Sequence, residues 1–172
     1  MKQRMVAIAW IWIGLALTVP ASAAEGVELS TRVSGVVEEV LAKPGQHVRK
    51  GAVLLRLDRT VLRARLDEAA AEQARADADE EDAKRELDRA EELFNRTVSS
   101  TSELEAATLR HVRAKATLAA ANARLAIAKK NLSDAELKAP FNGVVSAVPG
   151  MPGTVVAAEC QPRPLVVLKP GP

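Results

Sequence analysis

The sequence predicts an α+β protein: a β-sandwich made of two similar half-units, with a long antiparallel α-helical coiled-coil hairpin inserted between them. Three observations support this prediction. The 172-residue chain holds nine Gly and nine Pro, yet none of them lies between residues 52 and 139. The flanks of this gap are rich in Val and repeat each other, whereas apolar residues inside the gap recur at heptad spacing. Because Gly and Pro are excluded from helix interiors, the gap is typical of a helical insertion.

Residues 1–23 are predicted to be a cleavable signal peptide. Lys2 and Arg4 form a positive first segment, and residues 5–19 are an apolar run of 15 residues. A membrane span needs about 20 residues, so this run is short for one. Ala21-Ser22-Ala23 supplies the small side chains that signal peptidase requires. We therefore expect an exported, periplasmic protein that starts after Ala23, with cleavage after Ala24 or an uncleaved anchor as the alternatives.

The composition after this segment excludes several functions. Removing Lys2 and Arg4 from the 24 basic residues leaves as many bases as acids, so general electrostatic binding to nucleic acid is not expected. Phe94 and Phe141 are then the remaining aromatic residues, too few for base stacking. The single Cys160 provides neither an intrachain disulfide nor zinc-ligand spacing, and is interpreted as a small, partly buried hydrophobe.

The two flanks, residues 24–58 and 137–172, are predicted to be the halves of one sandwich. Seven identities recur at an offset of 108 residues: Gly35, Val36, Val37, Val40, Pro44, Gly45 and Val48 match Gly143, Val144, Val145, Val148, Pro152, Gly153 and Val156. Leu57 and Leu165 are expected to keep the same register. Neither half, at about 30 residues, buries a core alone, so the halves should pair.

Residues 59–136 are predicted to form the helical hairpin, with its turn near residues 97–101. The first helix is rich in acids: residues 67–92 hold twelve acids and four bases, against four acids and six bases in residues 102–136. Opposite charge favours pairing of the two arms, although each exposed ion pair is weak. Ser100 with Glu103 forms a capping-box pattern, and Ser102 with Glu105 offers a second start for the same helix. The predicted core positions are Leu62, Leu66, Ala69, Gln73, Ala76, Glu80, Ala83, Leu87, Ala90 and Phe94 in the first helix, and Leu104, Ala107, His111, Ala114, Leu118, Ala121, Leu125, Ala128, Leu132 and Ala135 in the second.

At this point the sequence resembles the periplasmic adaptor proteins, or membrane fusion proteins, of tripartite efflux and secretion pumps (HlyD and RND-adaptor type). The segment from Val33 to Asp58 is similar to the first lipoyl-like (biotinyl/lipoyl) half of that family, and Leu137-x-Ala-Pro-Phe-Asn-Gly143 resembles the start of the second half. Asn142 replaces the usual Asp, and residues 157–161 lack the Gly that normally precedes the final strand. The family's β-barrel and membrane-proximal domains have no counterpart, so the resemblance implies a minimal or truncated adaptor.

The resemblance also implies a docking site. In adaptors of resistance-nodulation-division (RND) transporters, an Arg-x3-Leu-x6-Ser motif at the hairpin tip docks onto an outer-membrane channel of the TolC type. Arg89, Leu93 and Ser100 have this spacing. Their structural alternatives are a solvated helix residue, a residue that closes the coiled coil, and a helix cap, respectively.

The resemblance implies a non-enzymatic, homo-oligomeric adaptor between an inner-membrane transporter, RND ahead of ABC or MFS, and an outer-membrane channel. It would associate with the inner membrane through that transporter. The residues offer no catalytic, cofactor or metal site, since His47 and His111 stand apart from any nucleophile. A biotin or lipoyl carrier is a weaker alternative, because the helical insertion occupies the place of the turn that displays the modified lysine. A structural coiled-coil scaffold is the other alternative, and the repeated sandwich halves argue against it.

Overall fold

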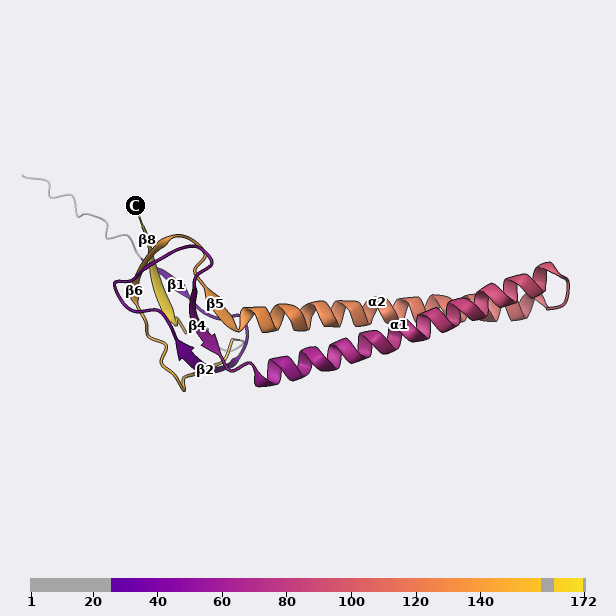
Figure 1. Ribbon diagram of the computed structural model, residues 1–172, viewed down its shortest axis with the longest axis horizontal. Helices are drawn as coiled ribbons and strands as arrows, with labels where there is room; N and C mark the ends of the chain where they lie inside the picture. The colour runs from indigo at the N-terminus through magenta and orange to yellow at the C-terminus, as the bar shows by residue number, and fades with distance from the viewer. Residues whose placement is uncertain (1–25, 159–162, 172) are drawn as a thin grey trace, which may run out of the picture.

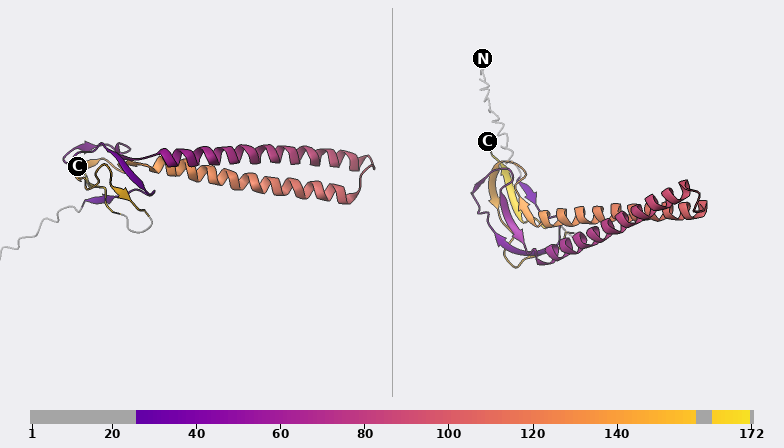
Figure 2. Two further views of the ribbon diagram at one scale, coloured as in Figure 1. Left: turned by 90° about the horizontal axis from the view of Figure 1, so that it is seen from below. Right: turned by 45° about the vertical axis from the view of Figure 1, so that its right-hand side comes forward.

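The computed structural model describes residues 26–158 and 163–171, so the predicted signal peptide and Cys160 lie outside the described residues. Two β-sheets form a small body at one end, and two long helices extend from it side by side (Figures 1 and 2). The elements in chain order are β1 Val27–Leu29, β2 Gly35–Val40, β3 His47–Val48, β4 Val53–Leu57, α1 Thr60–Asn95, α2 Thr101–Asp134, β5 Glu136–Lys138, β6 Gly143–Ala147, β7 Val155–Val156 and β8 Val166–Pro170.

The two half-units are interleaved in the sandwich, because each four-stranded sheet takes strands from both. One sheet has the order β1-β8-β6-β3 and the other has the order β5-β4-β2-β7. The turns at Gly45 and Gly153, whose φ angles are +82° and +86°, reach across to the opposite half. The Gly45 amide donates to Val145 O and the Gly153 amide donates to Val37 O, each at 2.8 Å. These equivalent bonds confirm that the sequence repeat is a structural repeat.

A second pair of equivalent bonds explains why Asn142 is tolerated. Asn142 Oδ1 accepts a hydrogen bond from the Lys50 amide at 2.8 Å. Its counterpart, Ser34 Oγ, accepts one from the Ala158 amide at 3.0 Å. An Asp carboxylate would accept the same bond, so the departure from the family pattern preserves the contact.

The expected equivalence of Leu57 and Leu165 is wrong. Val37 pairs with Leu57, whereas Val145 pairs with Leu168, so the offset in the last strand is 111 residues instead of 108. Three additional residues therefore lie in the connection between β7 and β8. A connection outside the sheet lengthens without disturbing the strand pairing, and Leu165 is itself fully buried, which made the two leucines indistinguishable by pattern.

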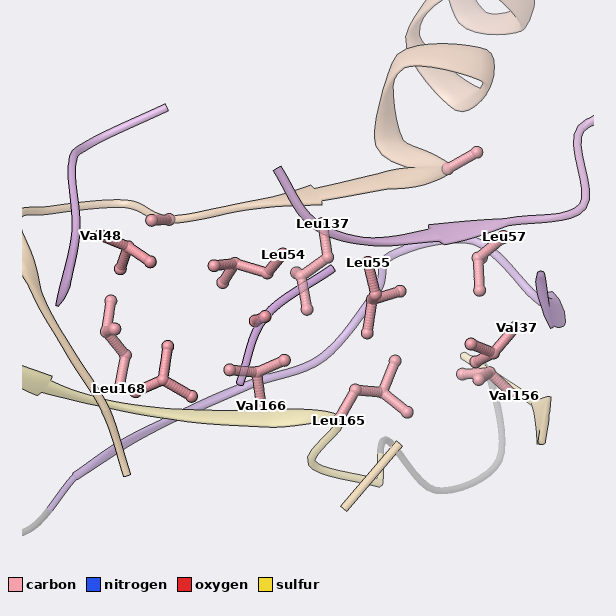
Figure 3. Close-up of a cluster of buried hydrophobic side chains, with 14 of the residues drawn as sticks. Val37, Val48, Leu54, Leu55, Leu57, Leu137, Val156, Leu165, Val166 and Leu168 are labelled. Atoms are coloured by element: carbon pink, nitrogen blue, oxygen red, sulfur yellow. The ribbon is translucent and has the colours of Figure 1, made fainter. Parts of the chain in front are cut away.

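The core lies between the two sheets (Figure 3). Leu54, Leu55 and Leu57 of β4 are fully enclosed, as are Val166 and Leu168 of β8. Adjacent residues of a regular strand point to opposite faces, but the β4–β5 register shifts between Val53 and Leu55. This irregularity accompanies the burial of two consecutive leucines.

The predicted heptad positions of the hairpin are buried or half-buried, except Phe94, which is exposed. Small side chains dominate the fully buried seam of the hairpin, which comprises Leu62, Ala69, Ala76, Ala83, Ala107 and Ala121. Such residues let two helices approach closely. The helices contain 36 and 34 residues, and are thus about 50 Å long at ~1.5 Å per residue. Arg110 of α2 pairs with Glu86 of α1, and Arg124 pairs with Glu72, as the opposite charges of the arms predict.

Candidate functional site

The tip of the hairpin is the loop between Asn95 and Thr101, at the end farthest from the sandwich (Figure 1). Helix α1 ends there in a Schellman motif, in which two amides beyond the helix satisfy its last carbonyl groups. The Thr97 amide donates to Phe94 O at 2.9 Å, and the Val98 amide donates to Leu93 O at 3.0 Å. The motif therefore holds the backbone of residue 98 against the last turn of α1.

Thr97 has the left-handed conformation that this motif requires, with φ of +60°. Glycine usually occupies this position, because a Cβ atom there costs about 1–2 kcal/mol. A β-branched residue is a true outlier in this conformation. The tip thus contains a local strain that its hydrogen bonds sustain.

Ser100 is the N-cap of α2. Its Oγ accepts a hydrogen bond from the Glu103 amide at 3.3 Å, and Glu103 Oε2 accepts one from the Ser100 amide at 3.1 Å. This reciprocal pair confirms the capping box predicted at Ser100 and excludes the alternative start at Ser102. Ser100 therefore has a structural role in setting the angle at which the chain enters α2.

Arg89 and Leu93 lie one turn apart on α1, so they share a face of the helix. Leu93 is 44% exposed, although it lies beside the last heptad positions. Arg89 is exposed and forms no ion pair with any residue in the described part of the chain, whereas its neighbour Arg96 pairs with Glu92. The three predicted residues thus lie at one end of the hairpin, with Ser100 across the turn from the other two.

The sequence did not identify Val98 as an exposed apolar residue of the tip, and the prediction of Phe94 as a core position is wrong. Val98 is 73% exposed and directly follows Thr97, which has the left-handed conformation. Phe94, predicted as a core position, is 36% exposed, because the coiled coil ends there. A Leu at position 93 and a Val at position 98 have the spacing of the hydrophobic pair that accompanies a Schellman motif. This spacing of apolar residues is the feature of the sequence that could have indicated the Schellman motif.

The base of the hairpin contains a cluster of charges around Glu136. Its carboxylate lies 3.2 Å from Arg59 Nη1, 3.2 Å from Lys138 Nζ and 3.5 Å from Arg56 Nε. The hydrogen bond from Lys138 is the main cause that lowers the pKa of Glu136 below its ordinary value, with smaller attraction from the two arginines and an opposing effect of burial. This cluster connects β4, β5 and the start of α1.

Asp58 anchors the start of α1. Its Oδ1 accepts hydrogen bonds from the Thr60 amide at 2.9 Å and from the Thr60 hydroxyl at 2.7 Å. These two bonds lower the pKa of the Asp58 carboxyl. The Leu57 amide donates to Ala135 O at 2.9 Å, which joins the two helix ends to the sandwich. The hairpin is therefore fastened to the sandwich at both of its arms.

Neither histidine lies in a catalytic arrangement within the described residues. His111 Nε2 is 2.9 Å from Glu80 Oε1, and both side chains are about one-fifth exposed in the seam of the coiled coil. His47 is exposed on β3. Among residues 26–158 and 163–171, no group of three His, Cys, Asp or Glu side chains is placed to hold a metal ion. In the same residues, neither long helix is apolar enough to cross a membrane.

The carrier alternative requires a lysine displayed at the turn between β4 and β5. The helical hairpin occupies this connection. Lys138 lies beyond it and pairs with Glu136 at 3.2 Å, and the Lys50 amide is bonded to Asn142 at the other end of β4. Lys43 precedes the Gly45 turn. These lysines are not in the position that a carrier uses.

Three curated relatives match most of this chain. The chain is 30% identical to the efflux pump periplasmic linker BepD of Brucella suis over 80% of its length, and 30% identical to the linker BepF of the same organism over 84%. It spans 35% of the length of each. It is also 33% identical, over 72% of its length, to the uncharacterized protein YdhJ of Escherichia coli, of which it spans 43%.

The solved structures show the same fold. ZneB from Cupriavidus metallidurans superimposes with a TM-score of 0.62 at 22% identity, over 86% of this chain and 62% of that one. A MacA–MexA chimera with the α-hairpin domain of Pseudomonas aeruginosa MexA gives a TM-score of 0.54 at 22% identity, over 83% of this chain and 45% of the chimera. The family model described as CzcB-like, barrel-sandwich hybrid domain matches residues 25–161. The chain therefore belongs to the CzcB-like barrel-sandwich hybrid family of periplasmic adaptor proteins.

Proposed function

We propose that this protein is a periplasmic adaptor subunit that links an inner-membrane transporter to an outer-membrane channel of the TolC type. The observation that carries the proposal is the tip of the hairpin. In a chain of this family, an exposed Leu93 and the Arg89 beside it lie at the far end of an arm about 50 Å long. An arm of this kind reaches a partner well away from the sandwich.

Each of the three tip residues has a distinct part in the proposal. Arg89 donates charge-assisted hydrogen bonds to carbonyl or carboxylate oxygens at the end of the channel. Leu93 enters a groove between channel helices. Ser100 positions both by capping α2, and its hydroxyl is already occupied by the Glu103 amide.

The remaining parts of the proposal concern the location and the assembly. Residues 1–23 direct export and are removed, and the protein acts in the periplasm without catalysing a reaction. The two half-motifs, residues 24–58 and 137–172, face the transporter side, and residues 59–136 reach the channel. Several copies assemble on an inner-membrane transporter, for which the tip motif favours the RND class over ABC and MFS. The names of the linkers BepD and BepF support this reading.

The test is binding to a purified TolC-type channel from the same organism. The adaptor is purified from the periplasm, where its intact mass also decides whether residues 1–23 are removed. Arg89→Asp is compared with wild type in surface-based binding kinetics. Arg63→Asp is the matched control, because Arg63 is an exposed arginine at the other end of α1.

Arg89→Asp should weaken binding by at least about 30-fold, since the loss of a buried, hydrogen-bonded charge costs about 2–5 kcal/mol. Arg63→Asp should bind like wild type. Thermal melts of both variants should stay close to wild type, because an exposed helix charge contributes about 0.5 kcal/mol or less. Equal binding by Arg89→Asp and wild type would refute the docking role.

A further inference from the structure

Val98 is the most exposed apolar side chain of the hairpin tip. It is 73% exposed, against 44% for Leu93 and 36% for Phe94. Its neighbours in the loop are polar: Arg96 and Thr97 precede it, and Ser99 and Ser100 follow it. About three-quarters of this apolar side chain stays in water, so its contact with the rest of the fold accounts for only a small part of its surface.

Thr97 adds a second, independent observation. It adopts φ of +60° at a position where glycine would be free of strain. Residues held in such conformations gather at binding sites, where the surrounding structure sustains the strain. Here the two Schellman bonds, from Thr97 to Phe94 and from Val98 to Leu93, sustain it. The chain therefore keeps a strained residue directly before an exposed apolar one.

We propose that Val98 is a second apolar docking contact, held beside Leu93 by the left-handed Thr97, and that both enter one groove between helices at the end of the outer-membrane channel. This inference rests on the function proposed above. The Val98 amide donates to Leu93 O at 3.0 Å, which holds the two residues close together at the end of α1, and both side chains are exposed. Thr97 is a positioning residue in this arrangement, since it acts through Val98.

The charges of the tip indicate the chemistry of the groove on the channel. Glu92 and Arg96 pair with each other, which leaves Arg89 one turn behind Leu93 without an ion partner in the described part of the chain. A complementary surface is therefore apolar at its centre and carries oxygen acceptors at its edge. The end of a helical channel offers both: apolar side chains between its helices, and free backbone carbonyl groups at helix C-termini.

The test uses Val98→Thr, which replaces a methyl group by a hydroxyl and keeps the β-branched shape. The matched control is Val112→Thr, because Val112 is 57% exposed on α2, away from the tip. The probe is the purified TolC-type channel. Val98→Thr should weaken binding about tenfold, whereas Val112→Thr should bind like wild type. Both variants should melt like wild type.

Thr97→Gly tests the positioning role. Relief of the left-handed strain should raise the unfolding midpoint, and the looser loop should shorten the lifetime of the channel complex several-fold. A purely structural role of Thr97 predicts an unchanged lifetime of the channel complex, since a more stable tip would bind equally well. Unchanged dissociation of Thr97→Gly would overturn the role of Thr97.

The outcomes separate this inference from the proposed function. If Arg89→Asp weakens binding and Val98→Thr does not, the channel is the partner but Val98 does not contact it. If both weaken binding, the inference is supported. If the wild-type protein does not bind the channel, both proposals fail together.

Discussion

Replacing Gly143 by alanine should unfold the sandwich far more readily than the same change at its repeat partner, Gly35. Gly143 begins β6, which is paired on one side with β8 and on the other with β3. A Cβ atom on Gly143 would lie 2.2 Å from the backbone oxygen of Lys169. At Gly35 the nearest atom would be Leu57 Cδ1, at 3.4 Å. One contact requires two strands to separate, whereas the other is ordinary packing.

The magnitudes follow from this difference. Overpacking of a core costs about 1–3 kcal/mol, and a clash with backbone belongs at or above the upper end of that range. We therefore expect Gly143→Ala to lower the free energy of unfolding by about 3 kcal/mol or more. Gly35→Ala should change it by less than about 1 kcal/mol, because glycine in a strand is itself unfavourable by about 0.5–1 kcal/mol relative to alanine.

The assay has to report on the strands specifically. The sequence has no Tyr, and its two Trp lie at positions 10 and 12, so fluorescence does not follow the sandwich. Hydrogen–deuterium exchange of peptides from β6 and β8 does follow it. A loss of about 3 kcal/mol should speed exchange there by about 100-fold under conditions of global or subglobal opening. Equal exchange and equal melting of the two variants would refute the steric argument.

Two further predictions concern half-buried charged groups. Glu136→Gln should lower the free energy of unfolding by about 1–2 kcal/mol at pH 7, because three basic groups lose their carboxylate. The folded pKa of Glu136 lies below the ordinary 4.5, so its contribution is complete above that pH and is lost as the pH falls below it. The melting temperatures of wild type and Glu136→Gln should therefore converge as the pH is lowered from 7 to 3. Glu38→Gln, on the exposed surface, is the control. A difference between wild type and Glu136→Gln that does not depend on pH would contradict this assignment. His111→Leu should destabilise the hairpin by about 1–3 kcal/mol, because Glu80 is left without its partner in the seam. The double change with Glu80→Leu should recover this loss in circular dichroism melts, and simple additivity would show that the two side chains are not coupled.

Local patterns in the sequence predicted much of the structure. The period of the apolar residues identified the seam of both helices, and Ser100 with Glu103 marked the start of α2. These features depend on residues within about one turn of each other, so a single stretch of sequence contains all of the interactions that decide them. The repeat likewise predicted two matching halves. The signal peptide, the division into segments and the docking role of Arg89, Leu93 and Ser100 stay predictions.

Several features of the sandwich were decided only by the tertiary structure, because they depend on residues far apart in the chain. The interleaving of the halves, with β3 on β6 and β7 on β2, depends on contacts between segments about 100 residues apart. The bond from Lys50 to Asn142 spans 92 residues. The true counterpart of Leu57 was hidden because Leu165 and Leu168 are both apolar, and only strand pairing distinguishes them. Thr97 escaped prediction for a different reason: its bonds are local, but glycine usually takes the left-handed position at a helix end, so a threonine there gave no signal.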